Sequence, residues 1–278
     1  MKIGVMMHMT DSTVTPAVLA VEAEQRGFES VFVTEHTHIP VRPFIEWRGG
    51  EAMPEFYKHL YDPIVALATA VSVTSTIKLG TGVLVLGQRE PLATAKQLAS
   101  LDVLSRGRLL CGVGYGWERN ELAQHGIEWS KRRAVFREHL SAVRELWTAD
   151  EAAFDGELIR FGPSWSYPKP LQTPHPQVLL GAAGSPATLL DVVYYANGWM
   201  PVEGTEPIPQ RWEQLRILAD QHDRDPASID LVIYGSTGDP ETVEGHRVDG
   251  ASRVVVGIDA GDVDHVRRQL DRHLALLA

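Results

Sequence analysis

A short apolar segment of the chain runs directly into a group of titratable side chains. The stretch VFVTEHTHIP brings Glu35, His36 and His38 close together. An acid beside a histidine can transfer protons next to a bound cofactor, because histidine titrates near neutral pH. The same residue types also bind zinc. The stretch therefore allows three interpretations: an acid–base site, a metal site, or a polar loop without chemistry.

The sequence around this stretch predicts a regular alternation of strands and helices. Strands are expected at 2–7, 30–34, 77–86, 108–114, 177–184, 198–201, 229–236 and 252–258. Helices are expected between them, several opened by a capping residue followed by proline, as in Thr15-Pro16. Eight strand–helix units predict an α/β fold, a (β/α)8 TIM barrel in one domain spanning 1–278. An open doubly wound sheet is the alternative.

Two connections are longer than a strand–helix turn needs, and long loops often shape a site. The first covers 37–61, and its aromatic and apolar residues predict a lid over an apolar substrate: Phe44, Trp47, Met53, Phe56 and Tyr57. The second covers 150–176 and contains FDGELIRF. Its Asp-Gly pair between two strand-like runs predicts a small hairpin inserted before the fifth strand.

The carboxyl ends of the predicted strands test the metal interpretation, because a TIM barrel carries its active site there. A catalytic metal usually has three or more protein ligands. The ends of the fifth and sixth strands contain no histidine, and only Asp259 follows the eighth strand as a further ligand. We therefore expect no metal site at Glu35, His36 and His38.

Two glycine-containing segments are candidates for contact with a ligand. GAAGSP, at 181–186, follows a strand and opens a helix, so backbone N–H groups and Ser185 could bind a phosphate. A tight turn with a serine cap explains this segment equally well. GTGV, at 80–83, lies inside a strand, where glycine indicates either a bulge beside a ligand or close packing.

Composition and charge exclude several classes of protein. The formal net charge is -10, which argues against nucleic-acid binding. No apolar run reaches the length of a membrane helix, and the first residues do not resemble a secretory signal. The single cysteine, Cys111, lies in a predicted strand and is expected to be buried and unreactive. We expect a cytoplasmic protein that acts on a small molecule.

Four stretches in the same order resemble the bacterial-luciferase-like (LLM class) oxidoreductases, which use FMN or the deazaflavin F420. They are GFESVFVTEHTHIP, IKLGTGVLVLGQREPLATAKQLASLDVLSRGRLLCGVGYGWERNE, YPKPLQTPHPQVLLGAAGSPATLL and NGWMP. The resemblance covers nearly the whole chain and is strongest to the F420-dependent subgroup. It implies a homodimer, with a flavin or F420 reductase as a possible cofactor supplier.

The resemblance also implies roles for individual residues. Glu35 and His36 would face the ring of the cofactor, with His36 as the acid or base. A strand bulge at Gly82-Val83, with a non-proline cis peptide, would support the ring from behind. The remaining cofactor contacts would come from the fourth strand and the fifth-strand turn: Gly112, Gly114, Tyr115, Gly181, Ala182, Ala183, Gly184 and Ser185.

The chain departs from the family pattern in ways that bear on the substrate. Trp117 stands where sugar-phosphate-oxidising members have a glutamate, which argues against a sugar phosphate. Ala183 replaces a glycine of the phosphate turn. Basic residues near the phosphate would favour F420 with its polyglutamate tail, and the candidates are Arg42, Arg48, Arg119 and Lys169.

The sequence therefore predicts an oxidoreductase that transfers a hydride between F420 and a small organic substrate. The alternative is an FMN(H2)-dependent luciferase-like monooxygenase, and the third hypothesis is a protein that binds a flavin without turnover.

Overall fold

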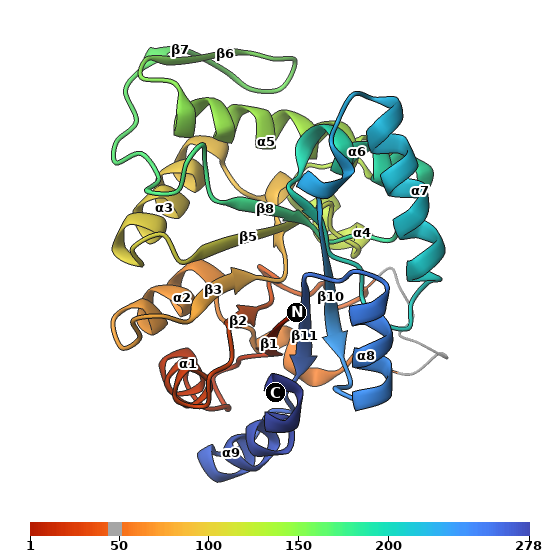
Figure 1. Cartoon of the computed structure of the whole chain (residues 1–278). Coiled ribbons are helices and arrows are strands. Elements are labelled where there is room, and N and C mark those ends of the chain that lie inside the picture. The colour runs from red at the N-terminus through yellow and green to blue at the C-terminus, as the bar shows by residue number, and fades with distance from the viewer. Residues whose placement is uncertain (44–51) are drawn as a thin grey trace.

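The strands of the chain close into a barrel surrounded by helices (Figure 1). The computed structural model describes residues 1–43 and 52–278. Its parallel strands follow the order β3-β2-β1-β11-β10-β9-β8-β5-β4. Pairing of Leu79 with Leu109 and of Gly80 with Leu110 joins β3 to β5 and completes the ring. The predicted TIM barrel is confirmed, and the open doubly wound sheet is wrong.

The barrel strands agree closely with the sequence prediction, apart from one interruption. Their bounds are β1 Lys2–Met7, β2 Ser30–Val33, β3 Lys78–Thr81, β4 Leu84–Val85, β5 Leu109–Gly114, β8 Gln177–Leu180, β9 Gly198–Trp199, β10 Asp230–Ser236 and β11 Arg253–Gly257. The strand predicted at 77–86 is divided into β3 and β4, with Gly82-Val83 between them.

The helices cover the outside of the barrel. Their bounds are α1 Pro16–Gln25, α2 Pro63–Val71, α3 Pro91–Leu104, α4 Arg119–Gln124, α5 Arg132–Thr148, α6 Pro186–Tyr195, α7 Ile208–Gln221, α8 Pro240–Val248 and α9 Val263–Arg272. Side chains of Thr15, Asp62 and Ser185 accept backbone N–H groups at the starts of α1, α2 and α6, so the capping signals act as expected. The short helix α4 was not predicted.

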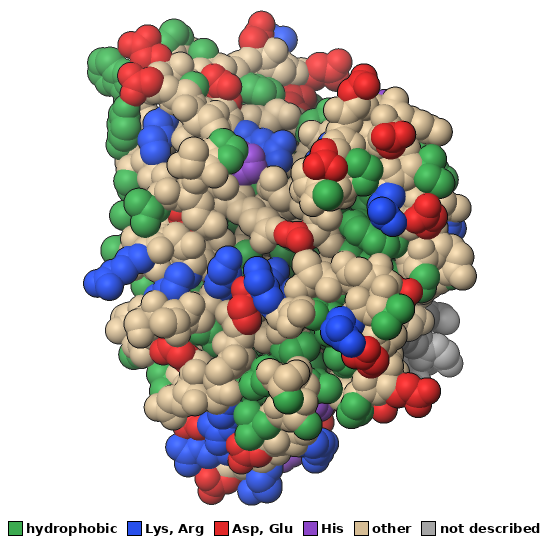
Figure 2. Space-filling model, in the orientation of Figure 1, with side chains coloured by type: hydrophobic (Ala, Val, Ile, Leu, Met, Phe, Trp, Pro, Cys, Tyr) green, Lys and Arg blue, Asp and Glu red, His purple; other side chains and the backbone are tan. Residues whose placement is uncertain are grey.

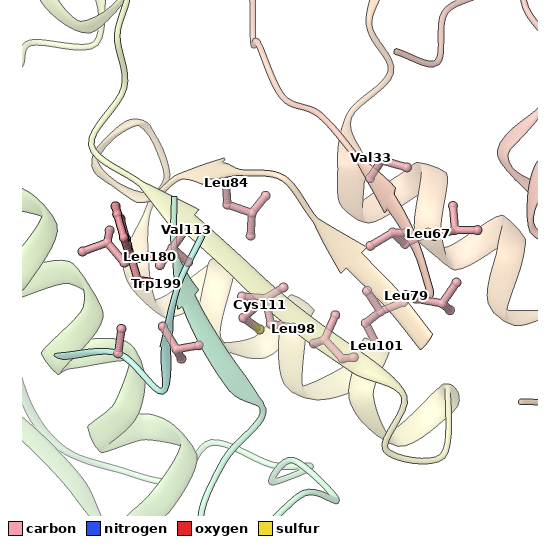
Figure 3. Close-up of a cluster of buried hydrophobic side chains, with 14 of the residues drawn as sticks. Val33, Leu67, Leu79, Leu84, Leu98, Leu101, Cys111, Val113, Leu180 and Trp199 are labelled. Atoms are coloured by element: carbon pink, nitrogen blue, oxygen red, sulfur yellow. The ribbon is translucent and has the colours of Figure 1, made fainter. Parts of the chain in front are cut away.

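Alternating side chains of the strands form two separate hydrophobic layers. The outer layer packs under the helices; Val33, Leu79, Cys111, Val113 and Leu180 belong to it, beside Leu67, Leu98 and Leu101 of the helices (Figure 3). The inner layer fills the barrel with the side chains that alternate with these: Met6, Phe32, Leu110, Leu179, Met200, Val232, Tyr234 and Val255. Cys111 is fully buried in the outer layer, as predicted.

The insertion before the fifth barrel strand forms the expected hairpin. Strands β6 (Ala152–Asp155) and β7 (Arg160–Ser164) pair antiparallel and lie beyond α5, at the top of Figure 1. Acidic and basic side chains are interspersed on the face shown in Figure 2, so no single charge dominates it. Among the helices of the described residues, none combines the length and apolarity that a membrane span requires.

Candidate active site

A cavity of about 550 Å³ opens at the carboxyl ends of the barrel strands. Segments that follow β1, β2, β5, β8 and β9 form its walls, together with the first turn of α5. Nine of the residues expected from the sequence line it: Glu35, His36, Gly82, Val83, Tyr115, Gly181, Ala182, Ala183 and Ser185. The other three, Gly112, Gly114 and Gly184, lie outside its lining.

A carboxylate from a distant helix is bonded to the candidate catalytic histidine. Nδ1 of His36 lies 2.7 Å from Oε2 of Glu121, on α4, and both side chains are buried. Burial alone would raise the pKa of Glu121, but hydrogen bonds from His36 and Thr37 outweigh burial and lower it. An ionised Glu121 accepts the Nδ1 proton of His36, so Nε2 is the ring nitrogen left for a ligand.

Glu35 does not orient His36 but holds the start of β4. One carboxylate oxygen of Glu35 accepts the Val85 N–H at 2.7 Å, and the other accepts Nε of Arg89 at 2.6 Å. Arg89 also bonds Asp62, the capping residue of α2, at 2.6 Å. Because a buried carboxylate needs such partners, Glu35 and Arg89 fix the strand end against the second helix.

The interruption between β3 and β4 is the expected cis peptide, Gly82-Val83. Val83 is directed to the cavity and packs against the inner-layer cluster. Glycine is required at position 82, because a Cβ there would lie 2.5 Å from the hydroxyl oxygen of Tyr234. That hydroxyl group is buried and has no hydrogen-bond partner among the described residues, although Tyr234 lines the cavity.

The turn between β8 and α6 faces the cavity with a limited set of donors. Ser185 caps the helix by accepting the Thr188 N–H at 3.2 Å, and its own N–H donates to Ala183. The Gly184 N–H is bonded to Oε2 of Glu206 at 2.7 Å. A phosphate at this turn would therefore meet Ala182 and Ala183 more readily than Gly184.

The glycines of β5 serve packing instead of lining the cavity. A Cβ at Gly112 would overlap the carbonyl oxygen of Thr81, and one at Gly114 would lie 2.7 Å from a methyl group of Val83. Both glycines allow β5 to lie close beneath β3 and the cis peptide. Their contact with a cofactor stays a prediction, because these two glycines do not line the cavity.

The positive charge at the cavity comes from two arginines at the start of α5; the sequence predicted this helix but did not include its arginines among the basic candidates. Arg132 and Arg133 line the cavity. Arg133 is paired with Asp191 at 2.7 Å, and Tyr115 donates to the same carboxylate at 2.5 Å. The Arg132 guanidinium lies 3.6 Å from the Trp129 ring centroid, and no described carboxylate forms an ion pair with it.

The basic residues expected from the sequence lie elsewhere. Arg42, Arg119 and Lys169 are absent from the cavity lining, and Lys169 donates to the carbonyl oxygens of Leu146 and Ala149. Arg48 lies outside the described residues, as do Phe44 and Trp47 of the predicted lid. The cationic side of the cavity is therefore Arg132 and Arg133 of α5.

Aromatic residues and a second histidine complete the wall around His36. Tyr57 and Trp117 meet the His36 ring edge-on, at centroid distances of 5.3 and 5.0 Å. His8, at the end of β1, stacks on Phe56 at 4.3 Å. Burial, and then the nearby His36, lower the pKa of His8 to about 4, so its ring is neutral at pH 7.

The metal interpretation of Glu35, His36 and His38 is not supported by their positions. Glu35 is paired with Arg89 and His36 with Glu121, whereas Nε2 of His38 lies 2.5 Å from the side-chain oxygen of Gln124. Asp259 is exposed at the end of β11. These side chains therefore have separate partners and do not converge on one point.

Comparison with known proteins identifies the family. Residues 8–238 match the luciferase-like monooxygenase family, and the chain belongs to it. An uncharacterized protein of Mycobacterium tuberculosis (strain ATCC 25618 / H37Rv) is 43% identical over 203 residues, which is 72% of each chain.

Two further proteins are similar to this chain, one in sequence and the other in structure. An F420-dependent glucose-6-phosphate dehydrogenase of Amycolatopsis mediterranei (strain U-32) is 36% identical over 173 residues, 60% of this chain and 46% of that protein. The crystal structure of monooxygenase RslO1 from Streptomyces bottropensis superposes with a TM-score of 0.79, at 21% identity, over 99% of this chain and 98% of the other. Membership of this family supports an enzyme of the oxidoreductase or monooxygenase class.

Proposed function

We propose that the protein transfers a hydride between coenzyme F420 and a small organic substrate. The observation that carries this proposal is the buried His36–Glu121 pair, which opens on a cavity bounded by Val83. Oxidation of an alcohol to a carbonyl releases a hydride and a proton, and the reverse reaction takes up both. A histidine with one free ring nitrogen can exchange that proton.

The residues around the cavity fit a deazaflavin with a phosphate-bearing chain. A volume of about 550 Å³ lies in the range of cofactor pockets. The small side chains at 181–183 leave room for close approach, and Arg132 offers a guanidinium to an anion. The Tyr234 hydroxyl group is buried against Gly82 of the cis peptide without a hydrogen-bond partner among the described residues, so this wall of the cavity retains an unsatisfied polar group.

Each protein group then has a defined task. Bound F420 would supply or accept the hydride. Glu121 holds the Nδ1 proton of His36, so that Nε2 accepts a proton from an alcohol or returns one to a carbonyl oxygen. Tyr57 and Trp117 exclude water around His36, which strengthens the interactions of its ring. The relative from Amycolatopsis mediterranei is F420-dependent, which supports the choice of cofactor.

The substrate of that relative does not transfer to this chain. Trp117 lines the cavity beside His36, where the family resemblance places a glutamate in sugar-phosphate-oxidising members. An indole cannot act as a carboxylate, and it favours an apolar surface. We therefore expect an alcohol or carbonyl compound with an apolar body.

Titration of the purified protein with F420 and with FMN, read by fluorescence, tests the cofactor. We expect saturable F420 binding, and turnover of the bound cofactor with a panel of apolar alcohols and ketones. Tight FMN binding without F420 binding would instead favour the reduced-flavin monooxygenase, which oxygen uptake with FMN and a flavin reductase would then reveal. F420 binding without any turnover would indicate a carrier protein.

A further inference from the structure

Beside the active site, three potential metal ligands surround one hydroxyl group. Oγ1 of Thr37 lies 3.0 Å from Nδ1 of His38, 2.7 Å from Nε2 of His125 and 3.2 Å from Oε1 of Glu121. One ligand atom from each of His38, Glu121 and His125 lies within 4.8 Å of the others. This group differs from the set considered in the sequence, because Glu121 and His125 replace Glu35 and His36.

We propose that His38, Glu121 and His125 form a binding site for a divalent zinc ion. Two imidazole nitrogens and one carboxylate oxygen are a ligand set that suits zinc, which leaves a fourth position for water. Magnesium and calcium prefer oxygen ligands in larger number, so they are poorer candidates.

The local structure places the ligands in suitable positions. Glu121 and His125 are four residues apart, on α4 and at its C-terminal cap, so they project from the same side of the helix. His38 approaches from the loop after β2, and neither it nor His125 is buried. Zinc with ligands at about 2.0–2.2 Å requires ligand atoms about 3.4 Å apart. Zinc binding therefore requires the two imidazoles to move closer than the spacing of up to 4.8 Å seen here.

The Thr37 hydroxyl group occupies the centre of the site without the metal. The hydroxyl donates to Glu121, and both imidazole nitrogens lie within hydrogen-bond distance of its oxygen. Zinc would replace these three hydrogen bonds by coordination bonds. The buried Glu121 is the fixed member of the group, because His36 and Thr37 both bind its carboxylate.

The site shares a carboxylate with the active site. Oε2 of Glu121 bonds His36, and Oε1 faces the zinc ligands. A zinc ion on Oε1 would withdraw negative charge from Oε2 and weaken its hydrogen bond to His36. Zinc is therefore expected to inhibit turnover; this effect rests on the proposed function, whereas zinc binding itself does not.

Competition with a chromophoric zinc chelator measures binding without cofactor or substrate. The wild-type protein is expected to bind one zinc ion, and single His38→Ala or His125→Ala variants to bind it on the order of 10-fold or more weakly. The double variant should lose the site. His222→Ala removes an exposed histidine at the C-terminal cap of α7 that contacts Tyr194, and serves as the matched control with unchanged binding.

Circular dichroism melts check that each variant is folded. Equal zinc affinity in the wild type and in the folded double variant would overturn the proposal, as would an absence of zinc binding by the wild type. X-ray absorption at the zinc edge gives a second measurement, because two imidazoles produce a recognisable scattering pattern. A spectrum without imidazole ligands would also overturn it. None of these readouts depends on which cofactor the enzyme uses.

Discussion

At the scale of single residues, the chemistry of His36 depends on which ring nitrogen is already bonded. Glu121 fixes Nδ1 and leaves Nε2 to the cavity, as in other sites where a carboxylate orients a histidine. Glu35, its neighbour in sequence, is occupied by Val85 and Arg89 instead. We therefore assign the orienting role to Glu121 and a structural role to Glu35.

Replacement of Glu121 by glutamine tests this assignment. The side chain keeps its size but loses the charge that holds the Nδ1 proton of His36, so kcat is expected to fall about 100-fold. The substrate KM and the dissociation constant of F420 should change little, because Glu121 does not line the cavity. Steady-state kinetics and cofactor titration measure the two effects separately.

Glu128→Gln makes the same chemical change at an exposed position and is expected to leave all three constants unchanged. Equal losses in kcat and in cofactor affinity for Glu121→Gln would show that the carboxylate maintains the shape of the pocket instead of acting through His36.

His8 provides a pH-dependent prediction at the same scale. Its pKa falls from 6.5 to about 4 on folding, because its ring is buried and lies near His36. The unfolded chain therefore binds more protons between these values, and stability decreases as the pH falls from about 6.5 towards 4. The free energy of unfolding is therefore expected to be about 2 kcal/mol lower at pH 5 than at pH 7. Urea unfolding at pH 7 and pH 5 measures it.

His8→Asn removes the titrating ring and should reduce the loss of stability between pH 7 and pH 5 by that amount. An unchanged pH dependence in the variant would mean that other groups account for it and that His8 titrates normally in the folded protein.

Residues close in sequence to a strand end were predictable, and those from distant elements were not. His36 and the turn at 181–185 follow strands with clear apolar patterns, so the barrel places them at the face where the cavity opens. Glu121 lies 85 positions from His36, and Arg132 starts an amphipathic helix whose pattern indicates only its buried side. The one available signal for Glu121 was its place soon after a strand end, in GVGYGWERNE.

At the scale of elements, the position of each strand depends on where glycines allow close approach. Gly80 leaves room for the Phe32 ring, Gly112 for the Thr81 carbonyl group and Gly82 for Tyr234. The sequence could predict the strands from their apolar runs, but it could not decide whether their glycines touch a ligand or a neighbouring strand. That distinction depends on contacts between strands far apart in the chain.

Gly112→Ala distinguishes packing between strands from contact with a ligand. An added Cβ would overlap the Thr81 backbone, which cannot move without disturbing β3, so we expect a loss of about 3 kcal/mol in the free energy of unfolding. Gly162→Ala, in the hairpin strand β7, meets no atom within 4 Å and should change stability by less than about 0.5 kcal/mol. Urea denaturation of both variants gives the comparison. Wild-type stability of Gly112→Ala together with weaker cofactor binding would restore the contact expected from the sequence.

At the scale of the whole molecule, the overall charge opposes the binding of an anionic cofactor. The chain carries a formal net charge of -10, and acidic and basic groups are mixed on the face shown in Figure 2. Attraction for a phosphate must therefore come from a local group. Arg132 meets this need, because no described carboxylate forms an ion pair with it, whereas Arg133 is held by Asp191, which also binds Arg137. The repulsion is long-range and screened by salt, whereas a direct contact in the cavity is screened less.

Arg132→Met tests whether this one side chain supplies the attraction. Methionine keeps much of the packing on Trp129 but cannot donate to an anion, so cofactor affinity is expected to fall about tenfold, the equivalent of one charge-assisted hydrogen bond. Arg247→Met, on α8, changes the net charge by the same amount. Arg247 pairs with Glu244 there, so this variant should have little effect on cofactor affinity.

Fluorescence titrations at low and high salt separate the contribution of Arg132 from that of the overall charge. Equal losses in both variants that vanish at high salt would assign the effect to the overall charge, and unchanged affinity in Arg132→Met would assign phosphate binding to the backbone of the turn at 181–185.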